Sequence, residues 1–171
     1  MKHKVLIFIT VLFVFVLGVV VYTKKFAAKK KIHYHAGFQV YKDGKKQEFS
    51  NIKYMNIQPC TENEKEYRED EQIEKAHLHD LDGDVVHVEA EGAKWKDLFT
   101  NIHFSFDSSK PLLGYVNGKK VDSILNYPIR AEDSVVIFSG KNPNVETALK
   151  GRITKKRIES VGRKSESCAT D

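Results

Sequence analysis

Histidine alternates with other residues in two short segments of this chain, and the alternation restricts how both segments fold. The first covers residues 33–35 (HYH), and the second covers 77–79 (HLH), with His87 following after a turn. Residues i and i+2 of a β-strand point to the same face of a sheet. Each pair therefore places two imidazoles side by side when its segment is extended. Because imidazole is a common ligand of zinc and copper, both segments are candidates for a metal site.

Residues 33–41 have the pattern of a half-buried strand. Apolar side chains alternate there with polar or small ones, and this period of two places the apolar set on one face of a sheet. Asp43-Gly44 is a hairpin signal, so we expect residues 45–49 to return as the partner strand.

The length of the turn after the second histidine pair decides which side chains share a face. A two-residue turn at Asp82-Gly83 would mix polar and apolar side chains. A three-residue loop over 81–83, with Gly83 in the left-handed conformation, pairs His77 with His87 and keeps the apolar residues together. We therefore expect the three imidazoles of this segment on one patch.

The predicted metal site consists of five imidazoles, with copper or zinc as the ion. The ligands are His33, His35, His77, His79 and His87. Asp80 is placed to orient one ring through a hydrogen bond to its second nitrogen, and Cys60 is either a buried thiol or an additional soft ligand. In the competing hypotheses the histidines are solvent-facing, pH-responsive groups or hydrogen-bonded structural ones.

Residues 5–22 are continuously apolar apart from Thr10 and Gly18. As a helix rising about 1.5 Å per residue, this segment would span about 27 Å, close to the thickness of a bilayer's hydrocarbon core. We interpret it as an uncleaved single-pass transmembrane anchor in contact with membrane lipid, after a short tail over 1–4. Removal of the segment by cleavage after Thr23 is the alternative.

Lysines lie on both sides of this segment, and two rules disagree on its orientation. The basic stalk over 23–31 has more lysines than the N-terminal tail. By the positive-inside rule, which places the flank richer in Lys and Arg in the cytoplasm, the folded domain would be cytoplasmic. A very short tail before an apolar run is instead typical of export signals. We expect the anchor in the cytoplasmic membrane with the folded domain outside.

Charge is segregated along the chain. Residues 32–149 carry 14 Lys and Arg against 20 Asp and Glu, whereas 150–164 carry seven Lys and Arg. We expect one domain over 32–140 with an acidic surface insert at 61–75, followed by a basic, disordered tail over 141–171. An acidic body with cationic ends does not indicate a nucleic-acid-binding domain.

Four segments of the sequence, two of which contain the histidine pairs, carry a resemblance to a known family: HYHAGFQVYKDG, AHLHDLDGDVVHVEA, YVNGKKV and VVIFSG. Together with the position of Cys60, they resemble a family of small membrane-anchored or secreted His-rich proteins of archaea and little-studied bacterial lineages. The resemblance covers most of 32–140 and implies an anchored histidine-rich domain, but no particular reaction. The insert at 61–75 departs from the shorter connection that the resemblance implies.

The end of the domain, residues 114–140, is similar to the last strands of β-grasp proteins. It contains the hairpin signal Asn117-Gly118 and an apolar run over 134–138. We therefore predict an α+β domain of mostly antiparallel strands, with a β-grasp-like arrangement as the specific expectation. Such an analogy of fold says little about function.

These observations favour a module that holds or relays copper or zinc at the cell surface. Nothing in the sequence resembles a nucleophile elbow, a phosphate loop or a zincin helix, so no catalytic residues are predicted. The alternative is a non-catalytic module that binds another envelope protein through exposed strand edges or its acidic face.

Overall fold

The computed structural model describes residues 12, 13, 15, 16, 18, 32–56 and 71–164. The chain divides into two compact units, Met1–Lys31 and Ile32–Asp171. Among the described residues, no helix is both long enough and apolar enough to cross a membrane. Several predicted segments lie wholly or mostly outside the described residues: the tail over 1–4, the anchor over 5–22, the stalk over 23–31, Cys60 and residues 61–70 of the insert.

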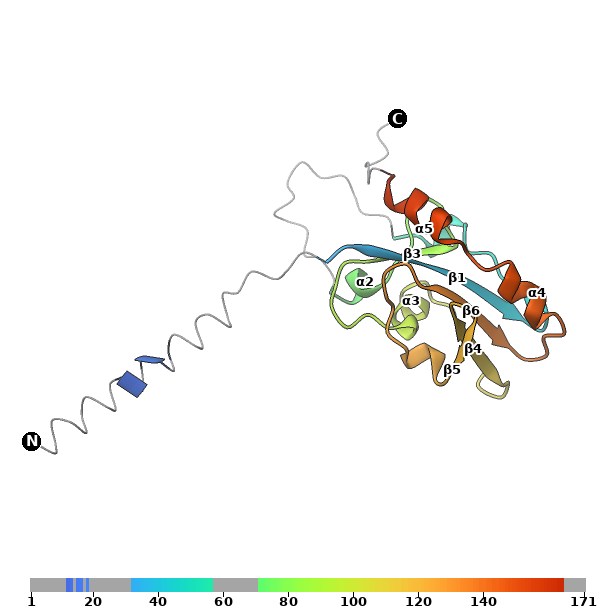
Figure 1. Ribbon diagram of the computed structural model, residues 1–171, viewed down its shortest axis with the longest axis horizontal. Coiled ribbons are helices and arrows are strands. Elements are labelled where there is room, and N and C mark those ends of the chain that lie inside the picture. Colours follow the sequence, from blue (N-terminus) through green and yellow to red (C-terminus); the bar gives the residue numbers. More distant parts are fainter. Residues whose placement is uncertain (1–11, 14, 17, 19–31, 57–70, 165–171) are drawn as a thin grey trace, which may run out of the picture. The chain divides into compact units, whose positions relative to one another are not determined.

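The second unit is an α+β domain built on a six-stranded mixed sheet (Figure 1), which confirms the predicted class. Its strands are β1 (Tyr34–Lys42), β2 (Lys45–Lys46), β3 (Val85–Val88), β4 (Leu112–Val116), β5 (Lys119–Val121) and β6 (Ser134–Ser139). The main path runs β2-β1-β6-β4-β5, and β3 pairs with β1. Among these strands the pairings are antiparallel except that of β1 with β6, which is parallel.

Both predicted hairpin turns are present. Asp43 and Gly44 join β1 to β2 with φ of 48° and 80°, and Asn117 and Gly118 join β4 to β5 with φ of 52° and 81°. Positive φ at both central residues is the geometry of a type I′ turn, whose twist matches that of the flanking strands. The return strand β2 is shorter than the predicted segment 45–49.

One face of the sheet packs against the main apolar core. Ala36, Phe38 and Val40 of β1 lie on this face and are almost fully buried. Helix α3 (Trp95–Asn101) covers them, and the rings of Trp95 and Phe38 are 6.0 Å apart. Helix α2 (Glu71–Lys75) packs against α3, and the 3₁₀ turns η1 (Ile52–Tyr54) and η2 (Ile124–Asn126) complete this layer.

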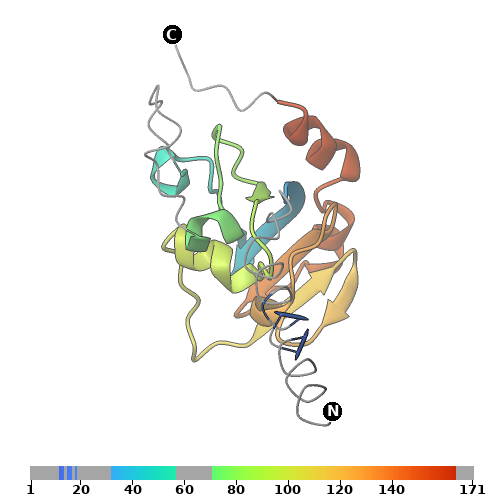
Figure 2. The same cartoon turned by 90° about the vertical axis from the view of Figure 1, so that its left-hand side faces the viewer.

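The opposite face is covered by α4 (Val145–Lys150) and α5 (Lys155–Gly162), as Figure 2 shows. The prediction of a disordered tail over 141–171 is therefore wrong for these helices. Ala148, Ile158 and Val161 recur between basic residues and are buried against the sheet. The lysines and arginines remain at the surface while the aliphatic side chains pack, so the high positive charge of the segment concealed an amphipathic pattern.

Gly37 of β1 brings the C-terminal segment close to the sheet. A Cβ at Gly37 would lie 2.6 Å from Cγ2 of Ile153 and 3.2 Å from Cδ1 of Ile158. Only glycine permits so close an approach. His35 is two residues earlier on the same face of β1, so this packing brings α5 next to the histidines.

Candidate metal centre

Three histidines form one row across neighbouring extended segments. His35 of β1 pairs with His87 of β3, and His87 pairs in turn with His77 through an antiparallel bridge. The predicted pairing of His77 with His87 is therefore confirmed. The pairing of β3 with β1 brings the two histidine clusters onto one face, because residues that pair across a sheet point the same way.

The turn that sets this register differs from the predicted loop. The left-handed residues are Asp80 and Leu81, with φ of 53° and 58°, rather than Gly83. Gly83 is needed for space instead, since a Cβ there would lie 2.3 Å from the backbone nitrogen of Ser50. The turn therefore keeps the predicted strand pairing with different backbone geometry.

The imidazole of His87 is the centre of the cluster. His33 and His77 stack against it, with ring centroids 4.5 and 4.8 Å away and interplanar angles of 24° and 22°. His35 and His79 approach edge-on, with centroids 4.6 and 4.7 Å away and angles of 79° and 70°. The five predicted ligands thus lie together, with the imidazole of His87 at the centre and the other four rings around it.

The nitrogen atoms of the cluster lie at distances suited to metal binding. Nδ1 of His87 is 2.7 Å from Nε2 of His79 and 3.1 Å from Nε2 of His35. Ligand atoms of the groups His33, His35, His87 and His77, His87, Glu89 all lie within 4.8 Å of one another in each group. Two nitrogens bound to one tetrahedral zinc are about 3.3 Å apart. These histidines, which range from exposed His33 to buried His87, can therefore hold a metal ion after small side-chain rotations.

Two of the rings are oriented by contacts with their other nitrogen. Nδ1 of His77 donates to the backbone carbonyl of Ile73 at 3.1 Å. Nδ1 of His79 donates to the carboxylate of Asp80 at 2.8 Å, the role expected for Asp80 from the sequence. Each contact fixes the ring and leaves Nε2 as the atom that can bind a metal.

Burial lowers the pKa of two imidazoles of the cluster. His77 is only 6% exposed. Burial, reinforced by repulsion from His87, lowers the pKa of His77 to about 4. Burial and repulsion from the surrounding histidines likewise lower the pKa of His35 to about 4. Since neutral imidazole is the form that binds metals, both rings are ready as ligands at neutral pH.

Glu89 is a member of the cluster that the sequence prediction missed. Its Oε1 lies 3.4 Å from Nε2 of His87, and the hydrogen bond with His87 lowers the pKa of Glu89. The signal was available, because Glu89 follows His87 by two residues and so shares its face of the strand. The chain therefore places a second carboxylate, in addition to that of Asp80, beside the five imidazoles.

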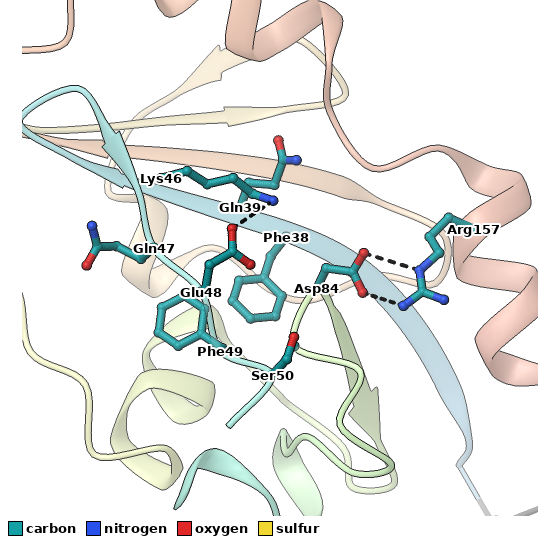
Figure 3. A pocket seen from close by; sticks show the side chains of 10 residues that line it. Phe38, Gln39, Lys46, Gln47, Glu48, Phe49, Ser50, Asp84 and Arg157 are labelled. Carbon is teal, nitrogen blue, oxygen red and sulfur yellow. Dashed lines mark hydrogen bonds and ion pairs between the residues drawn. The ribbon is translucent and has the colours of Figure 1, made fainter. Parts of the chain in front are cut away.

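Helix α5 lies over the cluster and is tethered beside it. A Cβ at Gly162 would lie 3.0 Å from Nδ1 of His35. Arg157 binds the carboxylates of Asp82 and Asp84 at 2.6 and 2.8 Å, and Lys164 binds Asp82 at 2.6 Å. Figure 3 shows the pair of Arg157 and Asp84 at the edge of a polar pocket of about 130 Å³. Among the described residues, none of the five histidines lines this pocket.

The remaining histidine of the folded unit, His103, contributes nothing to this geometry. His103 is exposed and lies apart from the cluster, with φ of 52°. Cys60 and Cys168 lie outside the described residues. No family model matches the chain, and no curated protein or solved structure gives a significant match to it, so the functional conclusion rests on the arrangement of these side chains.

Proposed function

We propose that this protein holds copper or zinc in the histidine cluster, as a module anchored through residues 5–22 with its domain outside the cytoplasmic membrane. The observation that carries the proposal is the convergence at Nδ1 of His87. Two other imidazole nitrogens, from His79 and His35, lie 2.7 and 3.1 Å from this atom.

When all of these rings are neutral and no metal is bound, their protons conflict. His79 donates from Nδ1 to Asp80, so its Nε2 presents a lone pair when the ring is neutral. If neutral His87 carries its proton on Nε2, next to Glu89, two lone pairs face each other at 2.7 Å. If the proton is on Nδ1, the lone pair of Nε2 faces the carboxylate of Glu89. A cation removes the conflict in either case.

The competing arrangement needs no metal. His87 as an imidazolium would donate to His79 and to Glu89 at once. Its ring is 1% exposed and lies beside the other imidazoles and the carboxylate of Glu89. Metal retention at neutral pH distinguishes the two arrangements.

The ligand types limit the choice of ion. A set of imidazoles with one carboxylate suits Zn(II) or Cu(II). His33 is exposed, His79 is partly buried and His87 is buried, so the cluster extends from the surface into the domain. This gradient supports loading and release of an ion, as a holding or relay function requires.

The proposal is tested by the metal content of the full-length chain purified in mild detergent. After loading with Zn²⁺ or Cu²⁺ and desalting, mass spectrometry should find at least one equivalent. The double variant His35→Gln/His79→Gln should retain at least one equivalent less than the wild type, because both contacts to Nδ1 of His87 are removed. The matched control His103→Asn removes an exposed histidine outside the cluster and should retain the metal. A wild-type chain that retains no metal after loading and desalting would contradict the proposal.

The resemblance to anchored His-rich proteins and the β-grasp-like arrangement remain part of this proposal. The central parallel pairing of β1 with β6 supports the second. The alternative is a module that binds an envelope protein through exposed strand edges or its acidic face. Binding by strand addition is disfavoured at both ends of the main sheet path. Lys45 and Lys46 of β2, and Lys119 and Lys120 of β5, are exposed there, and lysines on edge strands hinder the addition of a further strand.

A further inference from the structure

The two ring nitrogens of His87 face different ligand groups. Nδ1 lies against His35 and His79, at 3.1 and 2.7 Å. Nε2 lies 3.4 Å from Oε1 of Glu89. The two groups of potential ligands, one with His33 and His35 and one with His77 and Glu89, have His87 as their common member.

Building on the proposed function, we infer that the cluster binds two metal ions bridged by the imidazole of His87. The first ion is held by Nδ1 of His87 with His33, His35 and His79. The second is held by Nε2 of His87 with His77 and Glu89. An imidazole binds metals in its ring plane through each nitrogen, and bonds of about 2 Å place the two ions about 6 Å apart.

The edge-on rings fit the first ion. His35 and His79 meet His87 at interplanar angles of 79° and 70°, and their Nε2 atoms lie 3.1 and 2.7 Å from Nδ1 of His87, close enough for all three nitrogens to share one ion. His33 lies within 4.8 Å of His35 and His87 in its ligand atoms and would reach the same ion as His79 after a side-chain rotation. Four protein ligands would then complete a tetrahedral shell, which is the usual form of a closed site.

The second ion would have fewer protein ligands. Nδ1 of His77 is held by the carbonyl of Ile73, so Nε2 is left to bind the metal. Together with Glu89 and His87 this gives three protein ligands and leaves a fourth position for water or a small anion. The cluster therefore combines one closed and one open metal position.

Charge balance favours the bridge. Binding of the second cation displaces the remaining N–H proton of His87 to solvent, which leaves a bridging imidazolate with one negative charge. Glu89 adds a second negative charge. Asp80, which accepts from Nδ1 of His79 at 2.8 Å, adds a third beside the first ion. These anions offset most of the charge of two divalent ions.

The test uses Cu²⁺ and the full-length chain in mild detergent, with the copper content and the integrated EPR intensity measured together. We expect two equivalents of copper with an intensity far below that of two isolated ions, because an imidazolate bridge couples their spins. In the variant His77→Gln/Glu89→Gln we expect one equivalent with full intensity. Glu91→Gln alters an exposed glutamate close in sequence and should behave as the wild type.

Each other result has a distinct meaning. One equivalent in the wild-type chain overturns the bridged pair and leaves the proposed metal binding intact. Two equivalents with full EPR intensity also overturn it, because the ions would then be magnetically independent. No retained copper, repeated with zinc, overturns the proposed function as well.

Discussion

The two faces of β1 are both covered, but with side chains of opposite chemistry. Phe38 lies on one face among Phe49, Trp95 and Phe99, with ring distances of 5.5 to 6.2 Å. On the other face, His35 lies among imidazoles under α5. Burial of aromatic rings stabilises the fold, whereas burial of imidazoles requires a partner for every nitrogen. The aromatic face therefore stabilises the sheet, and the histidine face depends on that stability to hold its imidazoles together.

The largest expected effect tests the aromatic face. Phe38→Ala removes a ring that is 1% exposed and should lower the free energy of unfolding by about 3–5 kcal/mol. Gln39→Ala is the matched control on the opposite face. It removes a hydrogen bond to the carbonyl of Gly151 and should cost only about 1 kcal/mol. Denaturant titration measures both, and equal losses would contradict the division between the faces.

The histidine face should instead respond to pH. His77 has a folded-state pKa of about 4 against 6.5 for the free side chain. The unfolded chain therefore takes up a proton between pH 6.5 and 4 that the folded chain does not. Stability should fall as the pH falls through this window, and for the 6% exposed His77 the full loss is on the order of 3 kcal/mol.

This pH effect is measured on chelator-treated, metal-free protein by denaturant titration at pH 7 and pH 4.5. His77→Gln should reduce the difference between the two stabilities, and His103→Asn should leave it as in the wild type. If His77→Gln shows the wild-type difference, acid sensitivity arises elsewhere in the chain.

Gly37 and Gly114 allow the packing on the two faces of the sheet to be compared. A Cβ at Gly37 would lie 2.6 Å from Ile153 under the C-terminal segment, and one at Gly114 would lie 2.2 Å from Ile124 on the core side. Replacement of either by alanine should destabilise the domain by about 1–3 kcal/mol. Only Gly37→Ala should also weaken zinc retention, because it displaces the segment that leads into α5. Equal zinc retention in both variants would show that metal binding does not depend on the packing of the C-terminal segment against Gly37.

The smallest effect concerns the tethers of α5. Asp82 has a side chain that is 8% exposed and binds Arg157 and Lys164. Burial would raise the pKa of Asp82, but these hydrogen bonds outweigh burial and lower it. Asp82→Asn should cost about 1–2 kcal/mol, whereas Glu132→Gln, which breaks an exposed pair with Lys155, should cost less than about 0.5 kcal/mol. Thermal unfolding distinguishes the two variants.

Features fixed by neighbouring residues could be predicted from the sequence. The turns Asp43-Gly44 and Asn117-Gly118 follow from local backbone preference. The pairing of His77 with His87 follows from alternation across a short turn, because the wrong register would expose apolar residues. The prediction held although the left-handed residues proved to be Asp80 and Leu81.

Features that depend on distant contacts could not be predicted. The pairing of His35 with His87 joins segments 52 positions apart, and nothing local specifies it. The helices α4 and α5 depend on a sheet surface for their few apolar residues to cover. Without that surface their basic composition is typical of a solvated tail. Alternation in β1 therefore predicted one buried face where the structure has two.

The order of the segments along the chain has a consequence for assembly. All the proposed ligands precede residue 90, whereas the helix over them, α5, ends at Gly162. The parallel pairing of β1 with β6 joins residues nearly a hundred positions apart, and such long-range contacts form slowly during folding. We therefore expect the imidazoles to gather before their cover docks, so that a newly made chain would bind the proposed metal ion fastest while the site is still open.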